Sequence, residues 1–253
     1  MKRREGSALA GGVNNSVSSA VSVTCFTRGL RQIVESRMAG ASASAVIVYE
    51  VSRLLRKYPA LNATYRDGAM IAYEEVNLGF AMDDGRGLKV AVLPKCDTLS
   101  LQEIVLQLRE LTLAYIDDKL TPAQIANATF TISDLSGMGV SSFIPLISEN
   151  QGGILGVGGE QFAPDSVYGW FNLTLTFDHQ LSDGRTAACF LNDLKERLNH
   201  YEGTGTGQQP SQQPHLVCER CGRTASELSA THHYLLRSAS PQGCLCTLCA
   251  AGY

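Results

Sequence analysis

The 253-residue chain has no apolar run that approaches the ~20 residues of a membrane-spanning helix. The basic residues Lys2, Arg3 and Arg4 are not followed by the apolar stretch of a secretory signal. The chain also lacks a large excess of charge of either sign, because it has 21 Lys and Arg and 24 Asp and Glu, for a net charge of −3. This balance predicts no general affinity for nucleic acid or for acidic membranes. We therefore expect a cytoplasmic protein with neither as a partner.

Cysteine is scarce in most of the chain and concentrated near its end. Cys25, Cys96 and Cys189 stand singly, as small buried thiols do in a reducing compartment. The other five of the eight cysteines lie between Cys218 and Cys249. This contrast predicts a separate C-terminal element.

A segment without large apolar side chains separates that element from the rest. Residues 203–214, GTGTGQQPSQQP, have the composition of a flexible linker. We therefore expect a catalytic-sized domain over residues 1–202, the linker, and a small module over residues 215–253.

Within residues 1–202 the pattern alternates between helix and strand. Ser100 and Glu103 form a capping box, and Asp67-Gly68 is a hairpin signal. Periodicity predicts helices over 28–38, 43–58, 101–118 and 183–198, and strands over 17–26, 60–65, 70–73, 76–82, 88–93, 129–135, 152–157 and 168–177. This mixed order indicates an α+β fold with a mostly antiparallel sheet flanked by helices.

The C-terminal module contains two C-x-x-C pairs, Cys218 with Cys221 and Cys246 with Cys249, separated by 24 residues. Two such pairs in a small module predict a tetrahedral four-thiolate zinc site. Four protein ligands leave no open position, so the zinc would be structural.

Disulfides are the alternative for these cysteines, and the lack of a secretory signal disfavours them. Cys244, His232 and His233 are reserve ligands that we expect to be bystanders. The tail has few Lys and Arg residues, which argues against a nucleic-acid-binding module.

A histidine follows the apolar run 170–177 directly after Asp178. His179 has a side chain suited to a general base near neutral pH, although a lone histidine after a strand is more often a surface residue. Asp183 lies one helical turn further on and can pair with it or cap the next helix. Gly184 would allow close approach of the backbone. This arrangement makes His179 a candidate base.

Acyl transfer also needs a hydrogen-bond donor aimed at the developing oxyanion. Ser133, in the stretch 129–135, is a candidate. The local residues alone favour an ordinary serine at the end of a strand.

Several blocks in order extend this interpretation. They are 58–63 (YPALNA), 76–82 (VNLGFAM), 87–92 (GLKVAV), 120–122 (LTP), 129–135 (TFTISDL), 154–158 (ILGVG) and 178–184 (DHQLSDG). From about residue 3 to 198 the chain resembles the catalytic core of the dihydrolipoamide acyltransferases of 2-oxo-acid dehydrogenase complexes. That core shares its fold with chloramphenicol acetyltransferase.

The resemblance implies roles for these residues. His179 would be the general base, Ser133 would hydrogen-bond the oxyanion, and Gly184 would lie at the acyl-CoA site. Asp183 would hold the active-site loop, with an N-terminal arginine, Arg3 or Arg4. The resemblance also implies a homotrimer whose active sites take the histidine from one subunit and the serine from its neighbour. Coenzyme A and the acceptor would enter from opposite ends of a channel.

Three positions depart from the family pattern. Gln180 stands in place of arginine, Asp134 in place of asparagine, and Ala91 in place of proline. Neither a lipoyl domain nor a subunit-binding domain precedes the core in this sequence. The changed residues and the lack of these two domains both favour the same chemistry with another acceptor.

We therefore expect a stand-alone acyltransferase that moves an acetyl group from acetyl-CoA to a hydroxyl of a small molecule. A secondary-metabolite acceptor is the most specific form of this hypothesis. It would be a tetronate of antibiotic biosynthesis, which an acyl carrier protein could deliver. The alternative is a dihydrolipoyl transacylase core of a 2-oxo-acid dehydrogenase complex. A non-catalytic trimeric scaffold is a third hypothesis, disfavoured by the joint presence of His179, Ser133, Asp183 and Gly184.

Overall fold

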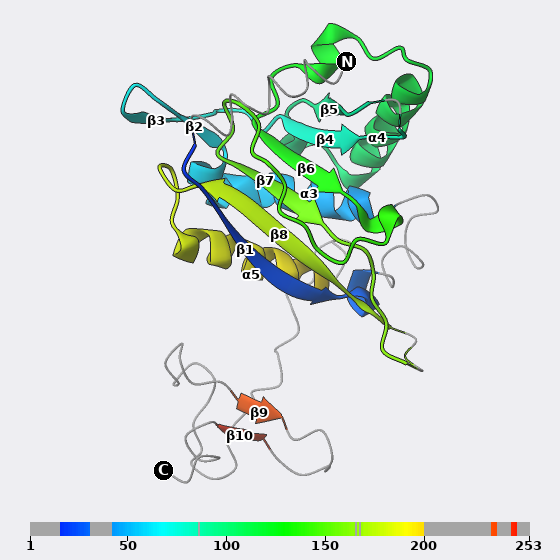
Figure 1. Cartoon of the computed structure of the whole chain (residues 1–253), viewed down its shortest axis with the longest axis vertical. Coiled ribbons are helices and arrows are strands. Elements are labelled where there is room, and N and C mark those ends of the chain that lie inside the picture. Colours follow the sequence, from blue (N-terminus) through cyan, green and yellow to red (C-terminus); the bar gives the residue numbers. More distant parts are fainter. Residues whose placement is uncertain are drawn as a thin grey trace. The chain divides into compact units, whose positions relative to one another are not determined.

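A six-stranded mixed sheet organises the N-terminal part of the chain in the computed structural model (Figure 1). The structure describes residues 16–30, 42–85, 87–164, 166 and 168–199, and the backbone of 234–236 and 244–246. By its contacts the chain divides into two units, residues 1–202 and 203–253. Each unit is described by itself.

The strands of the sheet lie in the order β1, β8, β7, β6, β4, β5. Their bounds are β1 (Ser18–Phe26), β4 (Leu78–Met82), β5 (Lys89–Leu93), β6 (Phe130–Asp134), β7 (Gly153–Val157) and β8 (Trp170–Asp178). β6 pairs in parallel with β4 and with β7, and the other three pairings are antiparallel. The α+β class is confirmed, and the sheet is mixed.

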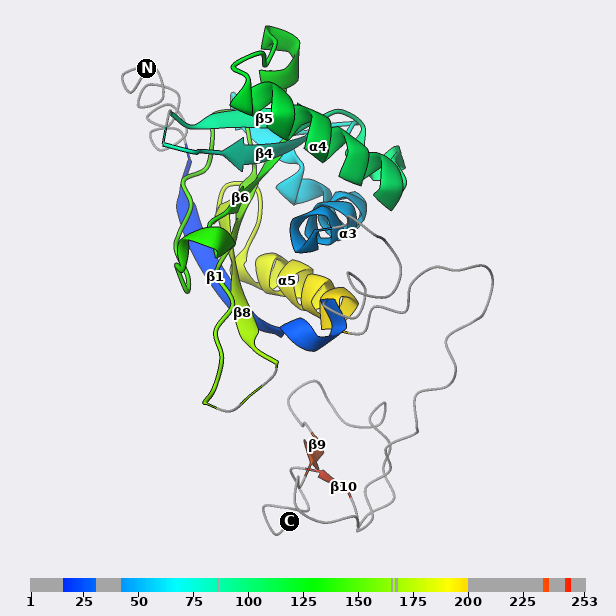
Figure 2. The same cartoon turned by 90° about the vertical axis from the view of Figure 1, so that its right-hand side faces the viewer.

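Three helices cover one face of this sheet, which Figure 2 shows edge-on. They are α3 (Ala43–Lys57), α4 (Leu101–Ile116) and α5 (Gly184–Asn199). The side chain of Ser42 caps the start of α3, and the predicted capping box of Ser100 and Glu103 starts α4. α3 ends two residues before Pro59, as a proline requires.

Alternation along the strands separates a face packed under the helices from the face away from them. In β8, Leu173, Leu175 and Phe177 are fully buried in the core under the helices. The residues between them face the other way, and the Thr174 hydroxyl hydrogen-bonds that of Ser22 in β1 at 2.9 Å. The face of the sheet away from the helices therefore carries hydroxyl groups at β1 and β8, and Thr174 and Thr176 are buried there.

A short hairpin, β2 (Ala63–Arg66) and β3 (Ala69–Ala72), lies beside the sheet. Its turn residues Asp67 and Gly68 have φ of 51° and 80°, which confirms the hairpin predicted there. The strand predicted to begin at residue 60 starts later. Pro59 opens a 3-10 turn, η1 (Pro59–Leu61), because its fixed φ suits the first residue of a helical turn.

Other 3-10 turns were not predicted: η2 (Cys96–Thr98), η3 (Pro122–Ile125) and η4 (Ser136–Met138). Of the helix predicted over 28–38, residues 28–30 are helical and the remainder lies outside the described residues. Among the described residues, no helix is both long and apolar enough to cross a membrane.

In the second unit, β9 (Tyr234–Leu236) and β10 (Cys244–Cys246) form an antiparallel hairpin. The linker 203–214 lies outside the described residues, as do Arg3, Arg4, His232 and His233. The predicted zinc ligands Cys218, Cys221 and Cys249 also lie outside them, and of Cys246 the backbone alone is described.

Candidate active site

His179 is the first residue after β8, on a turn that the backbone holds firmly. Its N–H donates to the Val17 carbonyl at 2.8 Å, next to the start of β1. Its ring lies 5.5 Å from the Phe177 ring, centroid to centroid, and the side chain is exposed. The backbone is thus fixed, while the imidazole faces outward where it can meet a ligand or another chain.

Asp178 anchors the same turn from inside. Its side chain is 4% exposed, and its Oδ1 accepts the N–H groups of Val17 and Gln180, both at 3.0 Å. The Gln180 amide also donates to each carboxylate oxygen at 3.3 Å. Sequence reasoning did not give Asp178 a role, although an acidic residue that ends an apolar strand beside a histidine is a signal for one.

Asp183 caps α5. Its Oδ1 accepts the Thr186 N–H at 2.7 Å. This hydrogen bond is the main cause that lowers the pKa of Asp183, with a smaller contribution from the nearby His179. A carboxylate at a helix N-terminus is also favoured by the helix dipole. Asp183 therefore acts in this chain as a structural group near the histidine.

Gly184 differs from the expectation. A Cβ added there would meet nothing within 4 Å, and its φ lies outside the left-handed region. The close backbone approach expected at this glycine does not occur within one chain, because α5 begins here with open space beside it. That space remains free for a ligand or a neighbouring molecule.

Ser133 lies near the end of β6, on the face of the sheet away from the helices. Its neighbours in register are Ala81 of β4 and Gly156 of β7. Phe143 and Pro145 pack over Gly156, and the Ser133 side chain is half-buried beside them. Ser133 is therefore only partly exposed on this face.

One chain does not bring Ser133 and His179 together. Through Gly156, Ser133 is level with Thr174 of β8, and His179 lies five residues further along the chain. At ~3.3 Å per residue and ~4.8 Å between strands, the backbones are separated by about 16 Å along β8 and about 10 Å across the sheet. The arrows of β6 and β8 in Figure 1 point to opposite ends.

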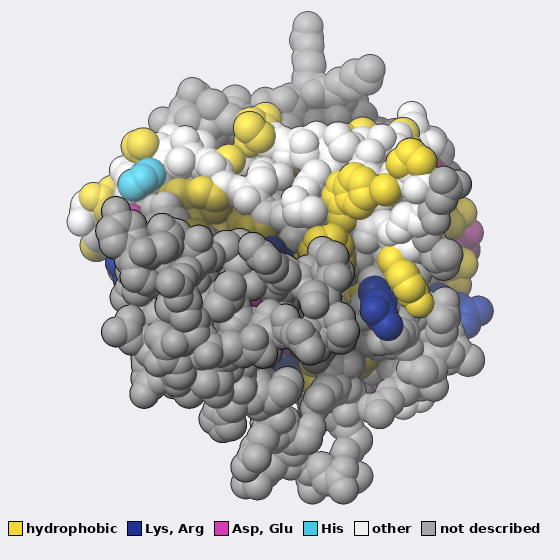
Figure 3. Space-filling model, turned by 90° about the horizontal axis from the view of Figure 1, so that it is seen from below, with side chains coloured by type: hydrophobic (Ala, Val, Ile, Leu, Met, Phe, Trp, Pro, Cys, Tyr) yellow, Lys and Arg dark blue, Asp and Glu magenta, His cyan; other side chains and the backbone are white. Residues whose placement is uncertain are grey.

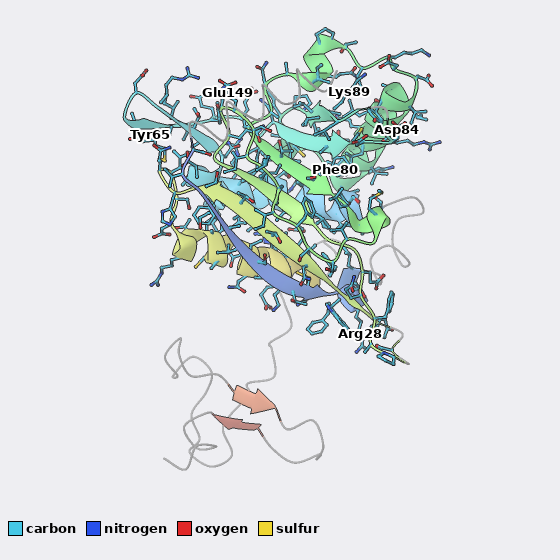
Figure 4. The ribbon with its side chains drawn as sticks, in the orientation of Figure 1. Arg28, Tyr65, Phe80, Asp84, Lys89 and Glu149 are labelled. Atoms are coloured by element: carbon cyan, nitrogen blue, oxygen red, sulfur yellow. The ribbon has the colours of Figure 1, made fainter. Side chains whose placement is uncertain are left out.

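Two cavities lie near these residues. A polar cavity of about 490 Å³ is next to the turn of His179, and Thr64, Arg66, Asn150, Gln151 and Asp178 are among its lining residues. Tyr65 and Glu149 also line it, and Figure 4 shows both near the β2–β3 hairpin.

The second cavity, of about 460 Å³, lies at the ends of β6 and β7. Ile47, Val157 and Phe171 give it apolar walls, while Asp134 and Ser44 supply polar groups. This combination suits a small organic ligand. This cavity is on the helix side of the sheet, because Asp134 points to the face opposite that of Ser133.

The described part of the surface in Figure 3 has few charged side chains in view. Within the described residues, no group of three or more His, Cys, Asp or Glu side chains could hold a metal ion.

Comparison with known proteins assigns the family. The catalytic domain of the 2-oxoacid dehydrogenases acyltransferase family matches residues 15–205. The chain belongs to this family. Its fold also resembles chloramphenicol acetyltransferase, with a TM-score of 0.54 at 13% identity over 78% of this chain and 95% of that one.

One relative is the dihydrolipoyllysine-residue acetyltransferase component of the pyruvate dehydrogenase complex of Staphylococcus epidermidis. It is 34% identical over 168 residues, which are 62% of this chain and 38% of the relative. The match therefore spans less than half the length of that curated relative.

A solved relative is the dihydrolipoamide acetyltransferase of Azotobacter vinelandii. Its TM-score is 0.72 at 25% identity, covering 79% of this chain and 88% of that one. In that enzyme, the roles of a serine, a histidine and an asparagine in the catalytic mechanism have been investigated. The asparagine lies four residues after the histidine.

Proposed function

We propose that this acyltransferase domain moves an acetyl group between coenzyme A and a thiol of a dihydrolipoyl group. The observation that best supports this proposal is the spacing of His179 and Asp183. They are four residues apart, as are the histidine and asparagine of the A. vinelandii enzyme. The S. epidermidis relative is itself a dihydrolipoyllysine-residue acetyltransferase. This acceptor is the one that the relatives favour over an alcohol.

In the proposed reaction, the His179 imidazole takes the proton of the acceptor thiol. The thiolate attacks the carbonyl carbon of acetyl-CoA and forms a tetrahedral oxyanion. The Ser133 hydroxyl donates a hydrogen bond to that oxygen. When the oxyanion collapses, the bond to the coenzyme A sulfur breaks, and that thiolate takes the proton back from His179.

The site would be completed by a second copy of the chain, in a homotrimer. His179 and Ser133 are too far apart within one chain to act on the same thioester. Ile144 and Leu146, which are 69% and 52% exposed, alternate with Phe143 and Pro145, whose side chains pack near Gly156. Exposed apolar side chains on a loop that covers this face of the sheet fit a subunit interface.

One cavity suggests where acetyl-CoA binds. The polar cavity beside His179 would receive the pantetheine arm of acetyl-CoA, with hydrogen bonds from Thr64, Asn150 and Gln151. The open space at Gly184 would keep that approach clear.

Steady-state transfer from acetyl-CoA to dihydrolipoamide tests this function. Loss of the general base in His179→Ala should lower kcat by ~10²–10⁴-fold. Loss of the oxyanion donor in Ser133→Ala should lower it by ~10²–10³-fold. Cys189→Ser, on the exposed side of α5, is the matched control and should keep full activity. A His179→Ala variant that loses less than about tenfold would exclude this mechanism and would favour the scaffold hypothesis.

An alcohol acceptor is the second candidate, and Gln180 favours it. This residue stands where the resembled enzymes have arginine, and its amide binds Asp178. A family member with a changed residue beside the base could serve a small-molecule alcohol such as a hydroxymethyl tetronate, either free or on an acyl carrier protein. Comparing kcat/KM for dihydrolipoamide and for such a tetronate distinguishes the two. Preference for the tetronate would replace the thiol acceptor.

We also propose a structural zinc ion in the C-terminal module, held by Cys218, Cys221, Cys246 and Cys249. The spacing of the two pairs supports it, as does a strand, β10, that ends at Cys246 where the second pair begins. Purified protein should contain one zinc per chain by elemental analysis, and Cys246→Ser should lose it. Cys244→Ser should retain zinc, because we expect Cys244 to be a bystander.

A further inference from the structure

We propose that Asp134 is the positioning residue that holds Ser133 in place for the oxyanion, an inference that rests on the proposed function. Asp134 follows Ser133 in β6, so its side chain points to the opposite face of the sheet. Both of its oxygens are used. Oδ2 accepts the Ser44 hydroxyl at 2.7 Å, and Oδ1 accepts the Ser136 N–H at 2.9 Å.

These two hydrogen bonds join three elements at the residue after Ser133. Ser44 lies in the first turn of α3, and Ser136 begins η4. The first turn of α3 has no acidic residue of its own, so the Asp134 carboxylate supplies the negative charge that a helix N-terminus favours. The strand end is therefore fixed against a helix as well as within the sheet.

The sheet and the next loop fix the other side of this point. The Leu135 N–H donates to the Val157 carbonyl at 3.0 Å, which continues the pairing of β6 with β7. A Cβ added to Gly158 would come within 2.3 Å of the Ser141 carbonyl oxygen. The loop after η4 thus packs tightly against the end of β7. Asp134 ties this unit, with Ser133 at its edge, to α3.

The effect should be on kcat. An oxyanion donor acts only when it lies 2.7–3.1 Å from the developing charge. A shift of ~1 Å can cost ~10²-fold in rate. Since Asp134 lies behind the sheet from Ser133, its removal should lower kcat about 10–100-fold while KM for acetyl-CoA changes less than about twofold.

The experiment is a double-mutant cycle with acetyl-CoA and dihydrolipoamide. It compares Asp134→Ala in the wild-type and Ser133→Ala backgrounds, with Asp134→Asn and Ser44→Ala as the graded variants. If Asp134 acts through Ser133, Asp134→Ala should have less than about a twofold further effect once Ser133 is removed.

Asp134→Asn should restore kcat to within about threefold of wild type, because its oxygen can accept the Ser136 N–H and its amide can donate to Ser44. Ser44→Ala removes one of the two bonds and should fall between Asp134→Asn and Asp134→Ala. If Asp134→Ala does not fold, Ser44→Ala takes its place in the cycle.

Any of three results would overturn this inference. The effects of Asp134→Ala and Ser133→Ala on kcat could be independent, the alanine variants at Asp134 and Ser44 could keep wild-type kcat, or Asp134→Asn could be as impaired as Asp134→Ala. By contrast, an inactive wild type or an unimpaired Ser133→Ala would overturn the proposed function itself. The two failures are therefore distinguishable.

Discussion

Mixing two inactive variants would test whether the active site spans two copies of the chain. His179→Ala removes the base, and Ser133→Ala removes the oxyanion donor. Each homotrimer should be strongly impaired. Within one chain the two residues are about 19 Å apart by strand register. The two groups can therefore act on the same thioester only if they come from different subunits.

Mixed trimers should regain activity in a calculable proportion. Each interface needs an intact His179 from one subunit and an intact Ser133 from the next. Every mixed trimer contains two copies of one variant and one of the other, so about one third of its interfaces combine the two intact residues. Because the parents keep only ~10⁻² of wild-type kcat or less, the purified mixed trimers should reach about one third of wild-type activity.

The assay requires co-expression of the two variants with different tags, followed by tandem purification and the dihydrolipoamide assay. A mixture that stays at the level of its parents would refute the interfacial site. A co-expressed pair of His179→Ala and His179→Ala/Ser133→Ala is the matched control, because it assembles in the same way and contains no intact interface.

Further predictions concern a glycine, an aspartate and the thiols. Gly184→Ala should raise KM for acetyl-CoA in initial-rate assays and leave the fold unharmed, or stabilise it by about 0.4–1 kcal/mol in urea unfolding, since its Cβ meets nothing. The lowered pKa of Asp183 means that its contribution to stability is present above the ordinary carboxyl pKa and is lost as pH falls through the folded value. Asp183→Ala should therefore flatten the acid limb of a stability–pH curve, and an unchanged limb would contradict the cap. Burial raises the pKa of both Cys25 and Cys96 to about 12, so iodoacetamide followed by peptide mapping should label the exposed Cys189 well before either of them.

The elements of this fold with strong local signals could be predicted from the sequence. The capping box at Ser100 and the turn at Asp67-Gly68 each satisfy local backbone groups, so their residues reveal them without the rest of the fold. The 3-10 turns could not be predicted, because a single turn has too few residues for a periodic pattern. At Pro59 that turn displaced the start of the next strand.

The separation of the candidate residues is a property of strand order, which no local pattern contains. β6 and β8 are both preceded by long connections, and their places on either side of β7 follow from tertiary packing. The family resemblance implied an interfacial site, and the register supplies the physical reason for one. The hydrogen bonds of Asp178 and Asp134 were equally hidden, because their partners Val17 and Ser44 are distant in sequence.

These two aspartates give the two halves of the proposed site the same construction. Each is adjacent in sequence to its candidate residue: Asp178 precedes His179, and Asp134 follows Ser133. Each carboxylate accepts a backbone N–H and a second hydrogen bond from another segment. A carboxylate with several donors resists displacement, because moving it would leave them unsatisfied. Catalytic groups that meet only across an interface need fixed positions before assembly, since neither half can correct the other within one chain. The fixed turn at His179 and the fixed strand end at Ser133 meet that requirement separately.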